Sequence, residues 1–139
     1  MIIINAENNI LGRIATFAAK KALMGESVRI VNCEKAIVSG SKADVLEKFR
    51  AKRERGIPLG GPYYKRSPEQ IVKRVVRGML PYKKEKGRNA YKSILCYKGI
   101  PGELSEKEFT NVPGADYLKL TKTQATMVGE ISKELGARS

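Results

Sequence analysis

The chain of 139 residues contains no histidine and no tryptophan, only three phenylalanines and only two cysteines. Without histidine, the most frequent general base and the commonest metal ligand are both missing. Cys33 and Cys96 stand far apart and form no Cys-x-x-Cys pair, so their spacing does not suit a metal site. Both lie in apolar surroundings, and we interpret them as buried thiols that stay reduced in the cytosol.

Sequence patterns of common catalytic sites are also missing. The chain has no Walker A motif, no Gly-x-Gly-x-x-Gly and no Gly-x-Ser-x-Gly. A nuclease would need carboxylates such as Glu34, Asp44 and Asp116, but Asp44 fits a helix cap and the other two fit turns or loops. We therefore predict that the chain is not an enzyme and has no catalytic residue, metal site, cofactor or small-molecule substrate.

Long apolar runs are absent too. None approaches the roughly 20 residues of a transmembrane helix, and no basic residue precedes the apolar start at Met1 to Ile4. The basic segments are interrupted by glycine and proline and lack the bulky apolar anchors of a helix that lies on a membrane. We expect no membrane partner.

Positive charge is what the chain has in excess. Lys and Arg total 27 against 14 Asp and Glu, a net charge of +13. Residues 48–92 hold fifteen basic and three acidic residues, so +12 of this charge lies in the middle third. A surface of this kind favours a polyanion as partner, and phosphate contacts would make binding depend on salt. The predicted RNA-binding residues are Arg50, Lys52, Arg53, Arg55, Tyr63, Tyr64, Lys65, Arg66, Lys73, Arg74, Arg77, Lys83, Lys84, Lys86 and Arg88.

Tyrosines and glycines lie between these basic residues. Tyr63, Tyr64, Tyr82 and Tyr91 are of a type that stacks on unpaired bases, which favours folded RNA over a regular duplex. The alternative is that each tyrosine packs against the protein. Residues 68–79 are expected to form a helix with a basic face. The alternative to RNA binding by this face is that it is only exposed to solvent.

Apolar spacing predicts an α/β chain. The stretches from 2 to 31 read as a strand, a helix and a second strand, which form a right-handed parallel unit. The strands expected from this spacing cover residues 2–4, 28–31, 36–38 and 94–97. The expected helices cover residues 10–22, 42–55, 68–79 and 125–135. The expected helix caps are Asn8 or Asn9, Ser41, Ser67 and Thr121.

Two segments between these elements carry glycine, proline or dense charge. Residues 56–66 contain three glycines and two prolines and are expected to form a long loop. Residues 82–92 are dominated by lysine and arginine, and we expect both segments to be mobile without RNA because like charges repel. The length suits a single domain over residues 1–139, with 48–92 as its RNA-contacting segment.

Three stretches of the sequence resemble the L-thirteen family of ribosomal large-subunit proteins, in its archaeal form. The first begins with Leu11-Gly12-Arg13-Ile14-Ala15 and continues to residues 28–32. The second covers residues 71–81 and contains Arg-Val-Val-Arg-Gly-Met-Leu-Pro. The third covers residues 87–101, begins with Gly-Arg and ends with Gly-Ile-Pro. The tail at 129–136 resembles the archaeal form as well. Asn5 stands where the family usually has Asp.

The resemblance implies a three-layer α/β/α fold around a small, mostly parallel four-stranded sheet, here with a basic loop–helix extension. It implies a structural constituent of the cytoplasmic ribosome that binds large-subunit ribosomal RNA, contacts neighbouring ribosomal proteins and supports subunit assembly and translation. Arg74, Arg77, Gly78 and Arg88 match family positions near RNA. The alternative is an RNA-binding translational regulator that acts off the ribosome and prefers one short messenger element.

Overall fold

The first two strands and the helix between them form the parallel unit that the sequence predicts. The computed structural model describes residues 1–54, 66–110, 112–115 and 125–135, with only the backbone for 52–54. Strand β1 (Ile2–Asn5) leads into helix α1 (Leu11–Leu23), and strand β2 (Val28–Val31) returns beside β1 with Ile2 opposite Val28. Gly25 has φ +94°, a conformation that glycine adopts without strain, and it lets the chain turn back after α1.

A third parallel strand, β4 (Ile94–Cys96), completes a sheet in the order β1-β2-β4. The strand predicted at residues 36–38 does not join this sheet. Strand β3 (Ile37–Ser39) pairs antiparallel with β5 (Ala125–Met127) instead. The described residues therefore form a parallel sheet of three strands plus a separate antiparallel pair, and the single four-stranded sheet is not confirmed.

The chain leaves the sheet after β2 for a local reason. Asn32 takes the left-handed conformation with φ 56°, and the 3-10 turn η1 (Cys33–Lys35) follows it directly. This turn carries β3 away from the sheet edge. At the free edge of β1, the backbone N–H of Thr110 donates to the carbonyl of Ile3 at 2.6 Å.

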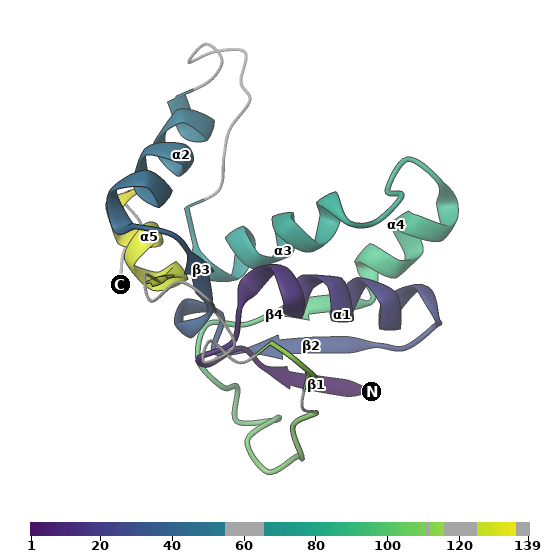
Figure 1. Cartoon of the computed structure of the whole chain (residues 1–139). Coiled ribbons are helices and arrows are strands. Elements are labelled where there is room, and N and C mark those ends of the chain that lie inside the picture. Colours follow the sequence, from purple (N-terminus) through teal and green to yellow (C-terminus); the bar gives the residue numbers. More distant parts are fainter. Residues whose placement is uncertain (55–65, 111, 116–124, 136–139) are drawn as a thin grey trace.

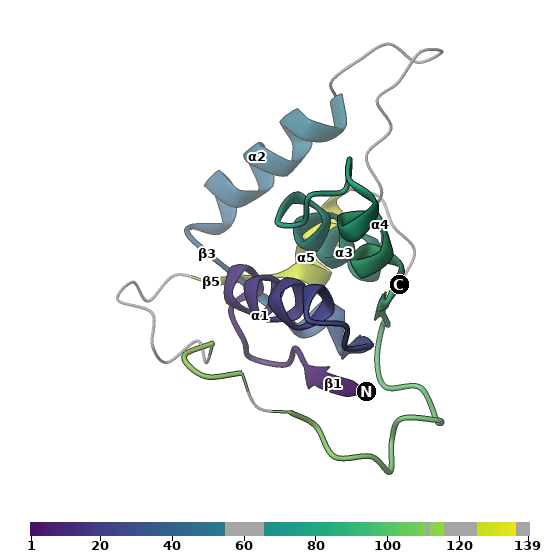
Figure 2. The same ribbon diagram turned by 90° about the vertical axis from the view of Figure 1, so that its right-hand side faces the viewer.

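Helices α1, α3 (Pro68–Gly78) and α4 (Glu85–Lys92) all lie on one face of the parallel sheet (Figures 1 and 2). The other face is covered by irregular chain between β4 and residue 110, where Leu104 packs against Ile3 and Val31. Within the described ranges, a second helical layer is thus not confirmed.

The main core lies between the sheet and this helical layer. Ile4, Ile14, Ile30, Ile71 and Ile94 are all completely buried there. Burial of such side chains stabilises the fold by about 1.5–3 kcal/mol each. The buried alanines of α1 have small side chains, which suits a helix that contacts α3, α4 and β2 at once.

Helix α2 (Lys42–Glu54) packs at the periphery against α5 (Val128–Glu134) and β5 (Figure 1). Its predicted start is partly confirmed, because the hydroxyl of Ser41 accepts a hydrogen bond of 3.3 Å from the backbone N–H of Asp44. Ser67 stands at the start of α3 as predicted, but its side chain makes no capping hydrogen bond.

Two predictions about local structure were wrong. The residue that caps α1 is Ile10, and neither Asn8 nor Asn9 caps the helix. Ala125 belongs to strand β5, so the last helix starts at Val128 rather than at 125. No helix was predicted within the basic stretch 82–92, but most of it forms helix α4, and the expectation that it is mobile without RNA stays a prediction. The cap predicted at Thr121 lies outside the described residues.

Among the residues that the structure describes, no helix is long and apolar enough to cross a membrane.

Candidate nucleic-acid interface

Helix α3 has one apolar face and one basic face. Ile71, Val72 and Val76 are completely buried against the core. The remaining positions carry Lys73, Arg74 and Arg77 toward the surface, as helical spacing requires. Val75 is only half-buried, and Met79 is 42% exposed near the end of the helix.

A tight turn connects α3 to α4 and depends on Gly87. A Cβ atom at Gly87 would lie 1.9 Å from the carbonyl oxygen of Pro81, so only glycine allows α4 to approach the turn this closely. The helix is short, but Glu85 in its first turn and Lys92 in its last turn both suit the helix dipole. The contact holds α4 beside the end of α3.

The turn and α4 add cations to those of α3. The side chains of Lys83, Lys84, Lys86 and Arg88 are all exposed. Together with α3 they form what we call the α3–α4 basic surface, whose members are Lys73, Arg74, Arg77, Lys83, Lys84, Lys86, Arg88 and Lys92. From 66 to 92 the chain has nine basic residues and two acidic ones.

Two tyrosines sit against cations of this surface. The guanidinium carbon of Arg77 lies 4.2 Å from the centre of the Tyr82 ring, and the ammonium of Lys73 lies 4.7 Å from the centre of the Tyr91 ring. Both distances are within the roughly 6 Å over which a cation is attracted to a ring face. The pairs orient the rings while Tyr82 remains 38% exposed.

A pocket of about 370 Å³ opens between the end of α3, the turn and α4. Its five lining residues are three cations and two aromatic rings: Arg77, Tyr82, Arg88, Tyr91 and Lys92. Arg88 also donates a hydrogen bond of 3.4 Å to the carbonyl of Lys83, which ties α4 to the turn. None of these cations forms a salt bridge with any carboxylate in the described part of the chain.

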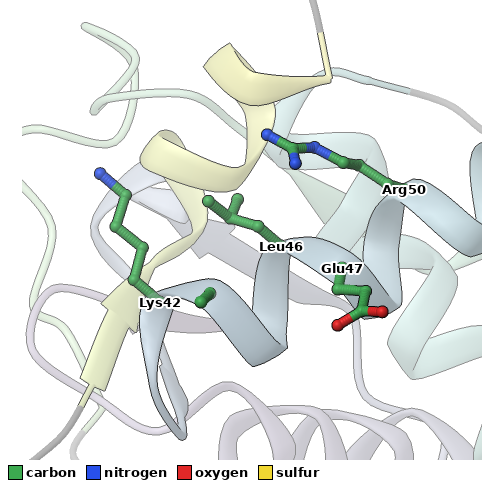
Figure 3. A pocket seen from close by; sticks show the side chains of 5 residues that line it. Lys42, Leu46, Glu47 and Arg50 are labelled. Carbon is green, nitrogen blue, oxygen red and sulfur yellow. The ribbon is translucent and has the colours of Figure 1, made fainter.

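A second, wider pocket of about 720 Å³ lies along α2 and is lined by Lys42, Ala43, Leu46, Glu47 and Arg50. Figure 3 shows that the side chains of Leu46 and Arg50 extend toward α5, whereas Glu47 points the other way. Arg50 donates to a carboxylate oxygen of Glu134 at 2.9 Å, so this cation is already paired within the protein.

The predicted RNA-binding residues therefore fall into separate groups. Lys73, Arg74, Arg77 and the cations of the turn and α4 come together, with Arg66 exposed just before α3. Arg50 lies apart on α2, which packs on α5, whereas α4 packs on α1. Lys52 and Arg53 belong to α2, but their side chains are not described, and Arg55, Tyr63, Tyr64 and Lys65 lie outside the described residues.

The convergence of Tyr82, Tyr91 and Lys92 on one pocket was not predicted, because α4 was not recognised. A weak signal was present. Gly87, Ala90, Tyr91 and Ile94 follow helical spacing, and in the structure Gly87, Ala90 and Ile94 are buried. Eight residues with two buried small side chains give little periodic signal among so many lysines.

Both cysteines are free thiols, and Cys33 is completely buried while Cys96 is half-buried. A hydrogen bond with the Cys96 side chain, together with burial, raises the pKa of the Cys33 thiol far above its usual range. Such a thiol stays protonated and unreactive. In the described ranges, no three Cys, Asp or Glu side chains gather in a way that would hold a metal ion.

Comparisons with known proteins identify the family. The sequence model described as ribosomal protein L13 matches residues 1–103. Large ribosomal subunit protein uL13 of Methanococcoides burtonii is 42% identical over 138 residues, 99% of each chain. The uL13 proteins of Archaeoglobus fulgidus (42% identical; 98% of this chain, 88% of the relative) and Methanopyrus kandleri (43%; 96% and 86%) are similar along nearly the whole chain as well.

These matches cover the stretches on which the resemblance was based, and these three relatives are archaeal, as expected. They are named as ribosomal proteins, members of a structural family, which confirms the prediction that the chain is not an enzyme. The chain belongs to the ribosomal protein L13 family.

Proposed function

We propose that this chain is a structural constituent of the large ribosomal subunit, that it binds large-subunit ribosomal RNA through its basic central segment, and that it supports subunit assembly and translation. The name of its relatives, large ribosomal subunit protein, supports the proposal that the chain is part of the large subunit. The α3–α4 basic surface supports the mode of binding.

The observation that carries this proposal is the division of α3 into two faces. The apolar face packs in the core, since Ile71, Val72 and Val76 are fully buried. The cations on the remaining surface have almost no acidic neighbours in sequence, and they repel one another unless a polyanion is present. RNA phosphates relieve this repulsion, and the counterions that they release favour binding.

The residue types suit phosphate contacts. Arginine presents a planar fork that matches two phosphate oxygens, whereas lysine acts as a point charge. We assign phosphate contacts first to Arg74, Arg77 and Arg88, whose helices are packed on the core. The full proposed set also includes Arg50, Lys52, Arg53, Arg55, Tyr63, Tyr64, Lys65, Arg66, Lys73, Lys83, Lys84 and Lys86.

We further propose that residues 1–139 act as a single domain, that neighbouring ribosomal proteins are its protein partners, and that it works in the cytoplasm as part of the ribosome. One helical layer and one continuous main core support a single folding unit. The reduced state of Cys33 and Cys96 agrees with a cytosolic compartment.

Sedimentation tests directly whether the chain is part of the large ribosomal subunit. An extract of cells that make this protein is separated on a sucrose gradient, with and without prior ribonuclease treatment, and every fraction is probed for the chain. We expect it to travel in constant ratio with the large subunit and to move to light fractions after ribonuclease.

The opposite outcome is equally clear. If the chain stays in light fractions without ribonuclease while it still binds RNA, it is not a subunit constituent. The alternative of a regulator that acts off the ribosome would then hold.

A further inference from the structure

We propose that the pocket between α3, the turn and α4 receives one unpaired nucleotide of the bound RNA, with its base stacked on the Arg77–Tyr82 pair and its phosphate held by Arg88 and Lys92. This inference rests on the proposed function, because it assumes that RNA lies on the α3–α4 basic surface. It adds contact with a base to a surface that otherwise recognises phosphates.

The size and composition of the pocket point to this occupant. Its volume of about 370 Å³ is near the lower end of the roughly 300–1,000 Å³ typical of sites for small ligands. That space suits one nucleotide and not a helix or a folded peptide. Two rings and three cations match the two parts of a nucleotide, a flat base and a charged phosphate.

The Arg77–Tyr82 pair is a platform that is already stacked. The guanidinium lies 4.2 Å from the ring centre, and Tyr82 is still 38% exposed. Bases stack on both aromatic rings and guanidinium planes, so a base extends this stack at little cost in side-chain order. Tyr91 forms another side of the pocket and is itself covered by Lys73 at 4.7 Å.

The pocket selects unpaired RNA over duplex RNA. In a duplex the bases are stacked on one another, and the deep, narrow major groove keeps side chains out. A base reaches the Tyr82 ring only if it is turned out of its strand. The site is held in shape because Gly87 packs directly under Pro81 and Arg88 is bonded to the carbonyl of Lys83.

The test uses the full chain and three labelled probes at low salt: a single strand of 12 adenylates, the same strand with abasic sites, and an RNA duplex of 12 base pairs. Fluorescence anisotropy gives the Kd of each. We expect the wild-type protein to bind oligoadenylate about tenfold more tightly than the abasic strand, which keeps the phosphates but loses stacking.

The variants separate stacking from charge. Tyr82→Leu should lose this tenfold preference, while Tyr82→Phe, which keeps the ring, should retain it. Phe109→Leu is the matched control, because Phe109 is 37% exposed but belongs to the irregular segment before Thr110, outside α3, the turn and α4. Thermal unfolding of each variant confirms that it is folded, as expected for a change at an exposed ring.

Three outcomes overturn the inference in distinguishable ways. If the wild-type protein binds none of the probes, the proposed function fails together with the pocket. If it binds the normal and abasic strands equally, or if Tyr82→Leu and Phe109→Leu behave alike, RNA binding stands and the pocket proposal fails. If free AMP competes as well as oligoadenylate at equal nucleotide concentration, the pocket is a mononucleotide site and not an RNA site.

Discussion

The side-chain amide of Asn32 donates a hydrogen bond of 2.9 Å to the side-chain oxygen of Asn5, and this contact joins the carboxyl ends of the neighbouring strands β1 and β2. The same oxygen of Asn5 accepts from the backbone N–H of Glu7 at 3.0 Å. An aspartate at position 5, which the resemblance to the family led us to expect, would offer the same acceptor. Asn5→Asp is therefore a tolerable exchange in geometric terms.

Replacing Asn32 should destabilise the fold at two points at once. Asn32→Ala loses the bond to Asn5 and places alanine at φ 56°, so we expect the free energy of unfolding to fall by about 2 kcal/mol. Asn8→Ala is the matched control, because Asn8 has φ 58° but is exposed. Its loss should be only about 1 kcal/mol. Equal losses in urea unfolding would show that the bond between the strands contributes nothing.

Gly87 should tolerate no side chain, whereas Gly78 should. Gly87→Ala forces the Pro81 carbonyl to move, and we expect a loss of about 1–3 kcal/mol, as for other overpacked sites. Gly78→Ala meets no atom within 4 Å and lies on a helix, so its unfolding free energy should stay level or rise by up to about 1 kcal/mol. Thermal unfolding of the two variants checks this, and a stable Gly87→Ala would contradict the close approach of α4 to the turn.

Removing two cations from α3 should weaken RNA binding and its dependence on salt. Because each phosphate contact contributes roughly 0.7–0.9 to the slope of log K against log salt, Arg74→Ala with Arg77→Ala should reduce the magnitude of that slope by about 1.5. Lys98→Ala with Lys107→Ala removes the same charge from exposed positions on the irregular segment. Binding isotherms at several salt concentrations distinguish the pairs. An unchanged slope for the arginine pair would remove α3 from the interface.

The ion pair between Arg50 and Glu134 should matter more for binding than for stability. Both side chains are about half exposed (54% and 41%), and exposed pairs contribute about 0–1 kcal/mol. Arg50→Ala should therefore leave the unfolding free energy within about 1 kcal/mol of wild type.

The same pair predicts a gain of RNA affinity. Glu134→Gln releases Arg50, so we expect tighter RNA binding than for Glu130→Gln, which removes the same charge from the same helix. If both variants bind equally, Arg50 does not contact RNA.

Cys33 should resist thiol reagents until the protein unfolds. Its side chain is completely buried, and a hydrogen bond with Cys96 together with burial raises its pKa. Iodoacetamide should therefore modify Cys96 first in the native protein and Cys33 only in denaturant, which peptide mass mapping will show. Rapid native modification of Cys33 would contradict its burial.

The raised pKa of Cys33 also sets the sign of a pH effect. The protonated thiol is favoured in the folded state, so its contribution to stability is complete below the unfolded pKa of about 8.5 and is lost as pH rises above it. Between pH 8.5 and 10, wild type should lose stability faster than Cys33→Ala in urea unfolding. Parallel curves for the two proteins would contradict this.

The sequence alone determined the features that depend on local spacing. The β1–α1–β2 unit, the buried face of α2 and the two faces of α3 all follow from apolar residues at regular intervals, because side chains three or four positions apart share one face of a helix. The net positive charge of the middle third also follows from the sequence alone, because it is a count of residues. The family was recognisable from its motifs, which are also local.

Tertiary structure alone decided the remaining features of the fold and of the site, because these features depend on contacts between residues far apart in the chain. Helix α4 is too short and too charged to be stable by itself, and it forms where Gly87 and Ala90 pack on the turn and the core. Strand β3 pairs with β5, some ninety residues later, since the turn at Asn32 carries it away from the sheet. The pocket of Arg77, Tyr82 and Arg88 exists only once α3, the turn and α4 are placed together, and no spacing in the sequence encodes that meeting.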